Sequence, residues 1–233
     1  MTDTALLENI KNIYRKISSA AIRSGRNPFD VKLIAVTKTV DIERIREAVS
    51  LGLRIFGENR VQEAQKKIAK CSVQCANCEL EWHMIGHLQK NKAKTAIQLF
   101  DMIHSVDSMD LAQELNKYAE RERKIQRVLL EVKLSIEETK YGVLKENLMD
   151  LIESVSRMTN LKLEGLMTMP PLFDNPEMAR PFFKGLREIR DNAEKSGYKL
   201  PNLSMGMTND FEVAILEGAT MVRIGTGIFG ERS

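Results

Sequence analysis

The 233-residue sequence has few cysteines, few aromatic residues and no long apolar run. Its cysteines number three, an odd count that argues against a disulfide framework and for a reducing compartment. No segment approaches the roughly 20 consecutive apolar residues that a membrane span requires. The N-terminal stretch MTDTALLENIKNIYRKI has the apolar period of an amphipathic helix and lacks the layout of a signal peptide. These features predict a cytoplasmic protein that does not span a membrane.

A strong charge of one sign is also missing. Lys and Arg number 35 and Asp and Glu number 32, so the net charge is only +3. A charge this small does not favour a nucleic-acid partner. The basic segment HLQKNKAK, from His87 to Lys94, has no interleaved aromatic residues, and we interpret it as a solvated helix face. The sequence therefore predicts no nucleic-acid binding.

Short β-type runs alternate with runs of helical period along the whole chain. This alternation predicts a parallel sheet, and eight strands in one chain of this length indicate a single (β/α)8 TIM-type barrel over residues 1–233 with an extra N-terminal helix. A doubly wound open sheet is the alternative, but no G-x-G-x-x-G follows the first strand. The predicted strands are Leu33–Lys38, Arg54–Asn59, Trp82–Gly86, Met102–Val106, Arg127–Leu134, Leu163–Met169, Leu203–Met207 and Met221–Ile224.

Several residues mark the expected ends of helices and loops. Asp41 and Asn209 have the side chains of helix N-caps, and Asn209 forms a capping-box-like pair with Glu212. The segment MPPLFDNPE, residues 169–177, contains three prolines and follows the sixth strand, as either a lid or simply a long loop. Glycines suited to helix C-termini are Gly52, Gly197 and Gly218.

The segment KLIAVTKTVD places Lys38 at the end of the first, largely apolar strand. Side chains at the C-terminal ends of barrel strands converge on one opening. A buried lysine is costly unless it is paired or deprotonated, and a deprotonated amine can form a Schiff base with a carbonyl. Taken alone, Lys38 fits a strand-end lysine whose amine reaches solvent at least as well.

Small residues follow the last two predicted strands. The segment SMGMTND contains Ser204 and Gly206 just before a helix, and RIGTG contains Gly225 and Thr226. Backbone N–H groups and hydroxyls at these barrel loops commonly hold a phosphate, although tight turns explain each glycine alone. Together with Lys38 they predict a ligand with an aldehyde and a phosphate, and pyridoxal 5′-phosphate (PLP) fits.

Arg223 lies two residues before the predicted phosphate loop. Proteins that bind PLP supply a partner for its pyridine nitrogen. An arginine there can only donate a hydrogen bond, so the nitrogen stays unprotonated and the cofactor is a weak electron sink. A buried ion pair is the other explanation for Arg223.

The segments AVTKTV, GENRVQEAQKK, WHMIGHLQKNK, HSVDS, KYGV, GLMTM and LSMGMTNDFEVAILEGATMVRIGTGIFGER resemble, in order and spacing, the pyridoxal phosphate homeostasis proteins. The resemblance runs from about Lys32 to Arg232, and that family looks like the barrel half of alanine racemase. It implies that Lys38 carries the Schiff base and that Arg223 faces the pyridine nitrogen. It also implies that the phosphate is held by Ser204, Gly206, Gly225 and Thr226.

Three further residues enter through the same resemblance. Asn59 is expected to line the pocket near the cofactor. Met205 is expected either to contact the ligand through its backbone or to pack in the core. The same two alternatives apply to Met207. His83 is expected either to approach the ring or to be a hydrogen-bonded core histidine.

Catalysis by racemases of this fold resembles a two-base mechanism, with a tyrosine supplied by a second domain across a dimer. Here the sequence ends directly after the last predicted strand, and of its four tyrosines only Tyr141 lies in a predicted loop. We therefore expect a monomeric PLP carrier or buffer in vitamin B6 homeostasis without turnover, with PLP-dependent apo-enzymes as candidate partners. A PLP-dependent, racemase-like enzyme is the alternative.

Two other chemistries have weaker support. A Schiff-base aldolase typically places its lysine on the sixth strand, where this sequence has only Met167, Thr168 and Met169. Zinc would suit the residue types Cys71, Cys75 and Cys78 followed by His83 and His87. Only four residues separate the last cysteine from the first histidine, which does not fit a zinc finger, so reduced thiols in a loop are the simpler interpretation.

Overall fold

A computed structural model describes residues 4–74, 79–135, 137 and 141–231 of the chain. Eight parallel strands form a closed barrel, since β1 pairs with both β2 and β9 and β4 pairs with β5. The predicted TIM-type barrel is confirmed, and the open sheet is excluded because the sheet has no break between β9 and β1. The barrel strands are β1 (Lys32–Val36), β2 (Ile55–Glu58), β3 (Glu81–Met84), β4 (Met102–Val106), β5 (Gln126–Lys133), β7 (Leu161–Met167), β8 (Asn202–Ser204) and β9 (Met221–Ile224).

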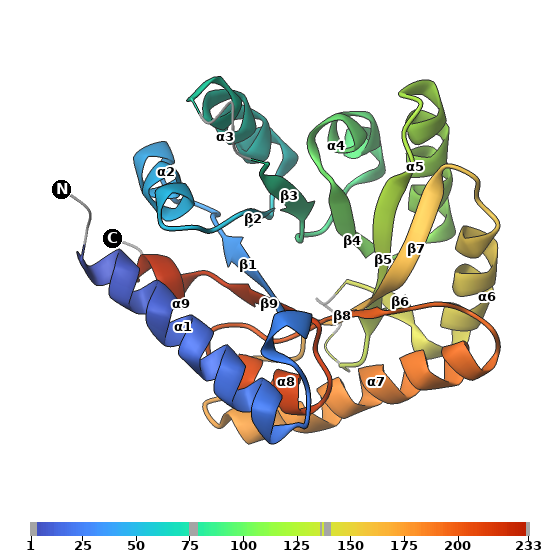
Figure 1. Cartoon of the computed structure of the whole chain (residues 1–233). Coiled ribbons are helices and arrows are strands. Elements are labelled where there is room, and N and C mark those ends of the chain that lie inside the picture. The colour runs from blue at the N-terminus through green and yellow to red at the C-terminus, as the bar shows by residue number, and fades with distance from the viewer. Residues whose placement is uncertain (1–3, 75–78, 136, 138–140, 232–233) are drawn as a thin grey trace.

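Helices surround the barrel (Figure 1). A two-residue strand, β6 (Val143–Leu144), pairs with β5 outside the barrel. Its length is too short to show any apolar period in the sequence, and it was not predicted. The helices are α1 (Thr4–Arg23), α2 (Ile42–Ser50), α3 (Val61–Gln74), α4 (Ala93–Leu99), α5 (Met109–Arg121), α6 (Lys145–Ser156), α7 (Arg180–Lys195), α8 (Phe211–Leu216) and α9 (Thr226–Phe229), with 3₁₀ turns at η1 (Pro28–Asp30), η2 (Lys90–Lys92) and η3 (Pro176–Ala179).

Alternate residues of each strand face opposite sides of the sheet. The outward side chains join the helices in one large apolar core, which includes Ala35, Phe56 and Val222. The inward side chains form a smaller apolar cluster inside the barrel, made of Ile34, Met102, Leu129, Met167 and Met221. This separation fixes which side chains of each strand reach the interior.

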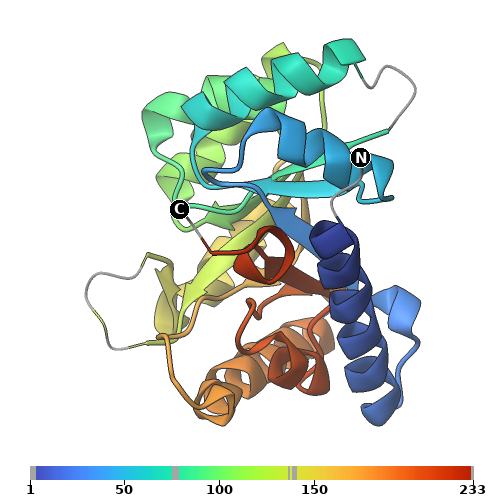
Figure 2. The same ribbon diagram turned by 90° about the vertical axis from the view of Figure 1, so that its left-hand side faces the viewer.

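The expected N-terminal helix is α1, which lies outside the barrel along α8 and α9 (Figure 2). Buried Leu6, Ile10, Ile13 and Ile17 form its inner face at helical spacing. The Asn9 amide donates to the carbonyl of Ile228 over 3.0 Å, which ties α1 to the last helix.

Two predicted caps have different outcomes. Asp41 is the N-cap of α2, and its carboxylate accepts the N–H of Arg44 over 2.9 Å. Asn209 is not a cap, because α8 begins at Phe211 and the Asn209 amide donates instead to the carbonyl of Phe173. The glycines predicted at helix ends all have positive φ, as expected: 99° at Gly52, 95° at Gly197 and 98° at Gly218.

Strand boundaries differ from the prediction mainly at the C-terminal ends. The ranges of β4 and β9 are as predicted, whereas β1 ends at Val36 and β8 at Ser204. Lys38 and Met207 therefore lie in loops after their strands.

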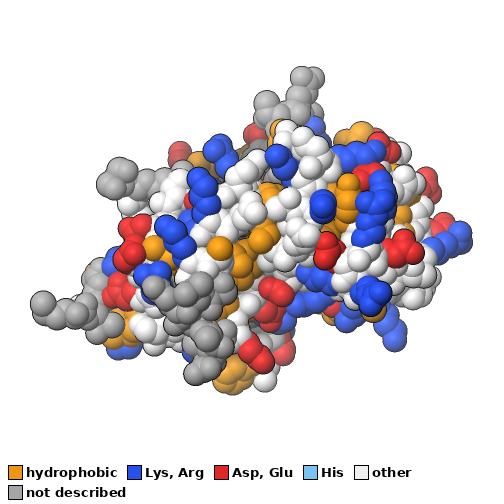
Figure 3. Space-filling model, turned by 90° about the horizontal axis from the view of Figure 1, so that it is seen from above, with side chains coloured by type: hydrophobic (Ala, Val, Ile, Leu, Met, Phe, Trp, Pro, Cys, Tyr) orange, Lys and Arg blue, Asp and Glu red, His pale blue; other side chains and the backbone are white. Residues whose placement is uncertain are grey.

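Within the described residues, no helix is long and apolar enough to cross a membrane. Figure 3 shows acidic and basic side chains interspersed over one face of the protein.

Candidate functional site

A cavity of about 890 Å³ opens where the barrel strands end. Its size lies within the usual range of small-molecule pockets. Its wall comes from residues at or beyond the C-terminal ends of β1, β2, β3, β7, β8 and β9, which is where barrel enzymes keep their sites. The wall includes Val36, Lys38, Asn59, Ile85, Met169, Met207, Thr208, Arg223, Gly225 and Thr226.

Lys38 lies on the cavity wall, two residues beyond the end of β1. Ile34 points into the barrel, so the alternation of β1 places Val36 on the same side, and Lys38 lies on the cavity wall after the strand ends. The prediction that the first strand extends to Lys38 was wrong, because β1 ends at Val36. Lys38 is half-buried in a turn because the strand ends earlier, which places its amine at the opening of the barrel.

Arg223 lies deeper in the same cavity, with only 3% of its surface exposed. Its guanidinium donates to the Ser204 hydroxyl over 2.6 Å and to the Thr168 carbonyl over 3.0 Å. Burial lowers the pKa of Arg223 to about 10, while the carboxylates of Glu131 and Asp210 favour its charged form. Arg223 is therefore a cation at neutral pH that can only donate hydrogen bonds toward a ligand.

Gly225 and Thr226 lie on the wall next to Thr208. The hydroxyl oxygens of Thr208 and Thr226 are 3.2 Å apart, and the Gly227 N–H donates to Thr208 over 3.3 Å. A Cβ at Gly227 would lie 3.1 Å from the Thr208 methyl group, so a larger residue would press on this contact. Hydroxyls and N–H groups in this loop suit a phosphate. Sequence reasoning missed Thr208, although the same SMGMT segment contains it.

Ser204, Met205 and Gly206 are absent from the cavity wall in the described structure. Ser204 is fully buried behind Arg223 because it is still within β8. Met205 packs in the outer core, as one of its two interpretations expected. Gly206 has φ of +91°, and a Cβ there would come 2.6 Å from the Cβ of Ala214. Contacts of these three residues with a ligand stay predictions, and the geometry favours roles behind the wall.

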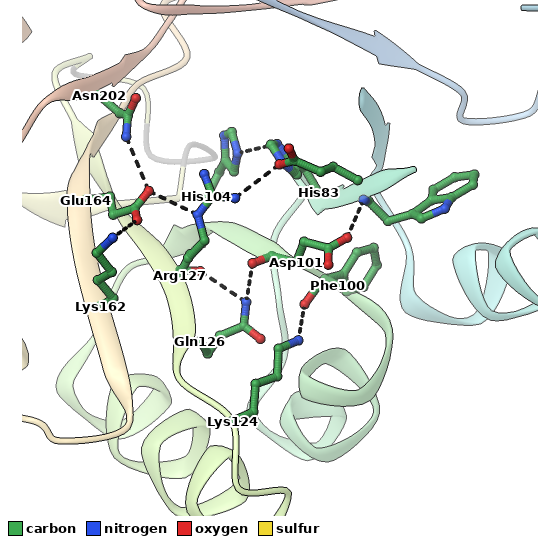
Figure 4. Close-up of polar contacts among 12 residues, drawn as sticks. His83, Phe100, Asp101, His104, Lys124, Gln126, Arg127, Lys162, Glu164 and Asn202 are labelled. Carbon is green, nitrogen blue, oxygen red and sulfur yellow. Dashed lines mark hydrogen bonds and ion pairs between the residues drawn. The ribbon is translucent and has the colours of Figure 1, made fainter. Parts of the chain in front are cut away.

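Behind Arg223 runs a chain of buried hydrogen bonds. The Ser204 oxygen lies 2.9 Å from Nδ1 of His104, and Nε2 of His104 lies 3.1 Å from Nδ1 of His83. His83 in turn contacts the Glu81 carboxylate over 3.3 Å. Of the two interpretations of His83, the hydrogen-bonded core histidine fits this position (Figure 4).

The two ends of this chain fix its direction. Arg223 can only donate, and the Glu81 carboxylate, whose pKa hydrogen bonding to His83 and Arg127 holds at about 2, can only accept. Burial lowers the pKa of His83 and lowers that of His104 well below its ordinary value, so both rings are neutral. Ser204 therefore donates to His104, His104 to His83 through Nε2, and His83 to Glu81 through Nε2.

The chain ends in an ion-pair cluster at the barrel floor, where the strands begin. Arg127 contacts Glu81 and Glu164 over 3.1 Å each, and Lys162 contacts Glu164 over 2.8 Å (Figure 4). Asn202 donates to Glu164 over 3.4 Å. These side chains cross the interior from β3 to β8 and close the end of the barrel opposite the cavity.

Among the described residues of the zinc hypothesis, Cys71, His83 and His87 do not form a metal-binding cluster. Cys71 is buried on α3, and Cys75 and Cys78 lie outside the described residues. His83 belongs to the buried chain, while His87 lies 3.4 Å from Asp107. In the part of the chain that is described, no cluster of three or more His, Cys, Asp or Glu side chains could hold a metal ion.

Known proteins are similar in sequence to this chain over nearly its full length. The pyridoxal phosphate homeostasis protein of Aquifex aeolicus (strain VF5) is 47% identical over 226 residues, which cover 97% of each chain. The chain belongs to the pyridoxal phosphate homeostasis protein family. The member from Escherichia coli (strain K12) is 38% identical and covers 100% of this chain and 98% of its own. The family model of the alanine racemase N-terminal domain matches residues 5–233.

Solved structures agree with this assignment. PipY of Synechococcus elongatus PCC7942, with PLP bound, is 37% identical with a TM-score of 0.82, covering 94% of this chain and 100% of that chain. An alanine racemase of Clostridium difficile is 16% identical with a TM-score of 0.75, covering 98% of this chain and 57% of that chain. At that identity the comparison shows only that this chain shares the barrel fold of that racemase.

Proposed function

We propose that this protein binds PLP as a Schiff base on Lys38 and serves as a carrier or buffer in intracellular PLP homeostasis, without turnover. One observation carries the proposal: Lys38, Arg223 and the Thr208–Thr226 hydroxyl pair all line one cavity. An amine, a cationic donor and a hydroxyl-lined loop match the aldehyde, pyridine nitrogen and phosphate of PLP. The PLP bound to the related PipY supports the same ligand.

Each wall residue has a distinct role in this proposal. Lys38 would hold the aldehyde of PLP through its amine, as a Schiff base whose formation releases one water. Thr208, Gly225 and Thr226 hold the phosphate through hydroxyl and N–H groups. Arg223 donates to the pyridine nitrogen and, as a cation at neutral pH, leaves that nitrogen unprotonated. Bound PLP would supply an electron sink, and this partner keeps that sink weak.

Among the described residues of the cavity wall, few side chains could transfer a proton at a substrate carbon. Proton transfer at a substrate carbon needs a positioned acid or base within hydrogen-bond reach. No histidine or tyrosine of the described chain lines the cavity. The loop tyrosine, Tyr141, instead stacks on His87 with ring centroids 3.7 Å apart. The carboxylates on the wall are those of Asp41, Asp210 and Glu231, and those of Asp41 and Asp210 each accept a backbone N–H of their own loop.

The visible spectrum of the purified protein tests the binding. Wild-type protein with added PLP should show the yellow absorption of a Schiff base, and Lys38→Ala should not. Lys32→Ala is the matched control, because Lys32 is an exposed residue of the same strand. A colourless wild-type protein that stays colourless with PLP would contradict the proposal.

Two assays on the PLP-loaded protein distinguish a carrier from an enzyme. A carrier should restore activity to a PLP-dependent apo-enzyme and leave the configuration of added L-amino acids unchanged. Racemisation that is lost in Lys38→Ala would favour the racemase-like alternative. The identity of the receiving apo-enzymes and the monomeric state stay predictions.

A further inference from the structure

We infer that Lys67, acting with Glu63 and Glu58, is a positioning residue that holds the turn carrying Lys38 in its strained form. The inference rests on the proposed function in one respect, since it assumes that the Lys38 amine is the reacting group. Lys67 lies on α3, on the helix side of the barrel wall, and does not line the cavity. It reaches the turn from the side opposite to the Lys38 side chain.

The turn is strained at Thr39, directly after Lys38. Thr39 has φ of +64°, a left-handed conformation that is rare for a β-branched residue. Such a conformation persists where surrounding contacts fix it. The contact here is short: the Thr39 N–H donates to Oε1 of Glu63 over 2.6 Å. The side chain of Glu63 therefore fixes the residue on the C-terminal side of Lys38.

Lys67 fixes the residue on the other side. Its ammonium donates to the carbonyl of Thr37 over 2.5 Å, to Glu58 over 2.9 Å and to Glu63 over 2.6 Å. These three contacts use its three donors. Lys67 follows Glu63 by one helical turn, the spacing at which such pairs meet. One ammonium thus holds Thr37 directly and Thr39 through Glu63.

Glu58 completes the cluster from β2. It is fully buried, and its Oε1 accepts the Thr37 hydroxyl over 2.6 Å as well as the Lys67 ammonium. Thr37 and Glu58 both face outward toward α3, whereas Lys38 faces the cavity. Because the backbone is held at Thr37 and at Thr39, the Lys38 side chain between them keeps its direction into the cavity. Holding a reactive group in place raises the rate of its reaction.

The test compares two adjacent lysines of α3. Lys67→Met removes the ammonium but keeps an unbranched side chain, and Lys66→Met is the control because Lys66 is exposed. One readout needs no PLP: the exchange rate of the Thr39 amide hydrogen, measured by NMR. The other is the rate at which PLP becomes attached to Lys38, measured by borohydride trapping at fixed PLP concentration.

We expect Lys67→Met to speed exchange at Thr39 and to slow attachment about tenfold, which corresponds to about 1.4 kcal/mol. Lys66→Met should change neither rate. Glu63→Gln keeps the shape of the side chain and loses only its charge, so it decides the matter if Lys67→Met does not fold. It should change both rates in the same direction by a smaller factor.

Each negative result has a different meaning. A lower unfolding midpoint with unchanged Thr39 exchange and an unchanged attachment rate would show that the cluster only stabilises the fold, and the inference would be wrong. If wild-type protein attaches no PLP, the proposed function fails, and Thr39 exchange alone decides whether Lys67 holds the turn. If PLP becomes attached to Lys38 at the same rate in wild type and in Lys67→Met, the proposed function holds but the positioning role of Lys67 is wrong.

Discussion

Arg223 donates from Nη1 to the hydroxyl oxygen of Ser204 over 2.6 Å. The Ser204 hydroxyl then donates to His104, so one side chain serves as acceptor for the buried cation and as donor for the buried ring. This places Ser204 behind the cation that faces the cavity. The proposed pyridine partner is thus supported from the interior of the barrel.

Removing the Ser204 hydroxyl should destabilise the protein. Ser204→Ala leaves Arg223 and His104 each without one buried partner, and we expect a loss of about 1.5–3 kcal/mol in unfolding free energy. Ser105→Ala is the matched control, since Ser105 is equally buried but its hydroxyl has no hydrogen-bond partner among the described atoms. Urea unfolding measures both. Equal losses in the two variants would refute the role given to Ser204.

The two hydroxyls of the SMGMT segment should behave differently toward PLP. Thr208→Val keeps the branched shape but removes the hydroxyl on the cavity wall, so we expect binding of PLP to weaken about tenfold, or about 1.4 kcal/mol. Ser204→Ala should change affinity less than it changes stability. Titration of each purified variant with PLP gives the affinities, and a larger affinity loss in Ser204→Ala would restore the original assignment of Ser204 to the phosphate.

Protonation of the buried histidines should destabilise the protein as the pH falls. Burial lowers the pKa of His104 in the folded state, so the unfolded state binds more protons and stability rises with pH. The stabilisation is complete above the unfolded pKa of about 6.5 and is lost below it. We expect the unfolding free energy of wild-type protein to fall between pH 7 and pH 5.

His104→Gln isolates this effect. The variant should be less stable at pH 7 and should lose less further stability at pH 5 than wild type. Burial raises the pKa of Glu58 and Asp210, and this makes the stability fall as the pH rises, opposite to the effect of the histidines. Wild type and His104→Gln share both carboxyl groups, so the difference between them reports His104. Ser105→Ala, which removes a buried hydroxyl that does not titrate in this range, should keep the wild-type slope. An unchanged slope in His104→Gln would contradict the neutral-ring arrangement.

A side chain at Gly206 should not be tolerated. Gly206→Ala combines φ of +91° with a Cβ only 2.6 Å from that of Ala214, so α8 or the loop must shift. Gly25→Ala is the control, with φ of +71° and nothing within 4 Å. Strain alone costs about 1 kcal/mol, and we expect Gly206→Ala to cost at least twice as much in thermal or urea unfolding. Equal losses of unfolding free energy in Gly206→Ala and Gly25→Ala would show that the loop shifts to accommodate the new side chain without further cost.

The alternation of apolar strands and amphipathic helices was enough to predict the barrel. The strands Met102–Val106 and Met221–Ile224 were predicted to the residue because polar or glycine-containing turns bound them closely. The end of β1 was misplaced because Thr37 and Lys38 continue the residue pattern of the strand. The left-handed Thr39 that ends this extension leaves no trace in composition.

The cavity-facing residues Lys38, Asn59 and Arg223 could be found from strand position and from resemblance. The presence of Thr208 rather than Ser204 on the cavity wall could not, because it depends on where β8 ends within one short segment. Lys67 was hidden for another reason. On α3 it forms an ordinary i,i+4 pair with Glu63, and its burial becomes visible only when Glu58 is brought in from a neighbouring strand.

The most direct test of this account is a peptide map of wild-type protein incubated with PLP, reduced with borohydride and digested. We expect one phosphopyridoxyl adduct, on the peptide that contains Lys38, and no stable adduct when the reduction is left out. An adduct on other lysines with Lys38 unmodified, or no adduct at all, would contradict the proposal that this barrel holds PLP through Lys38.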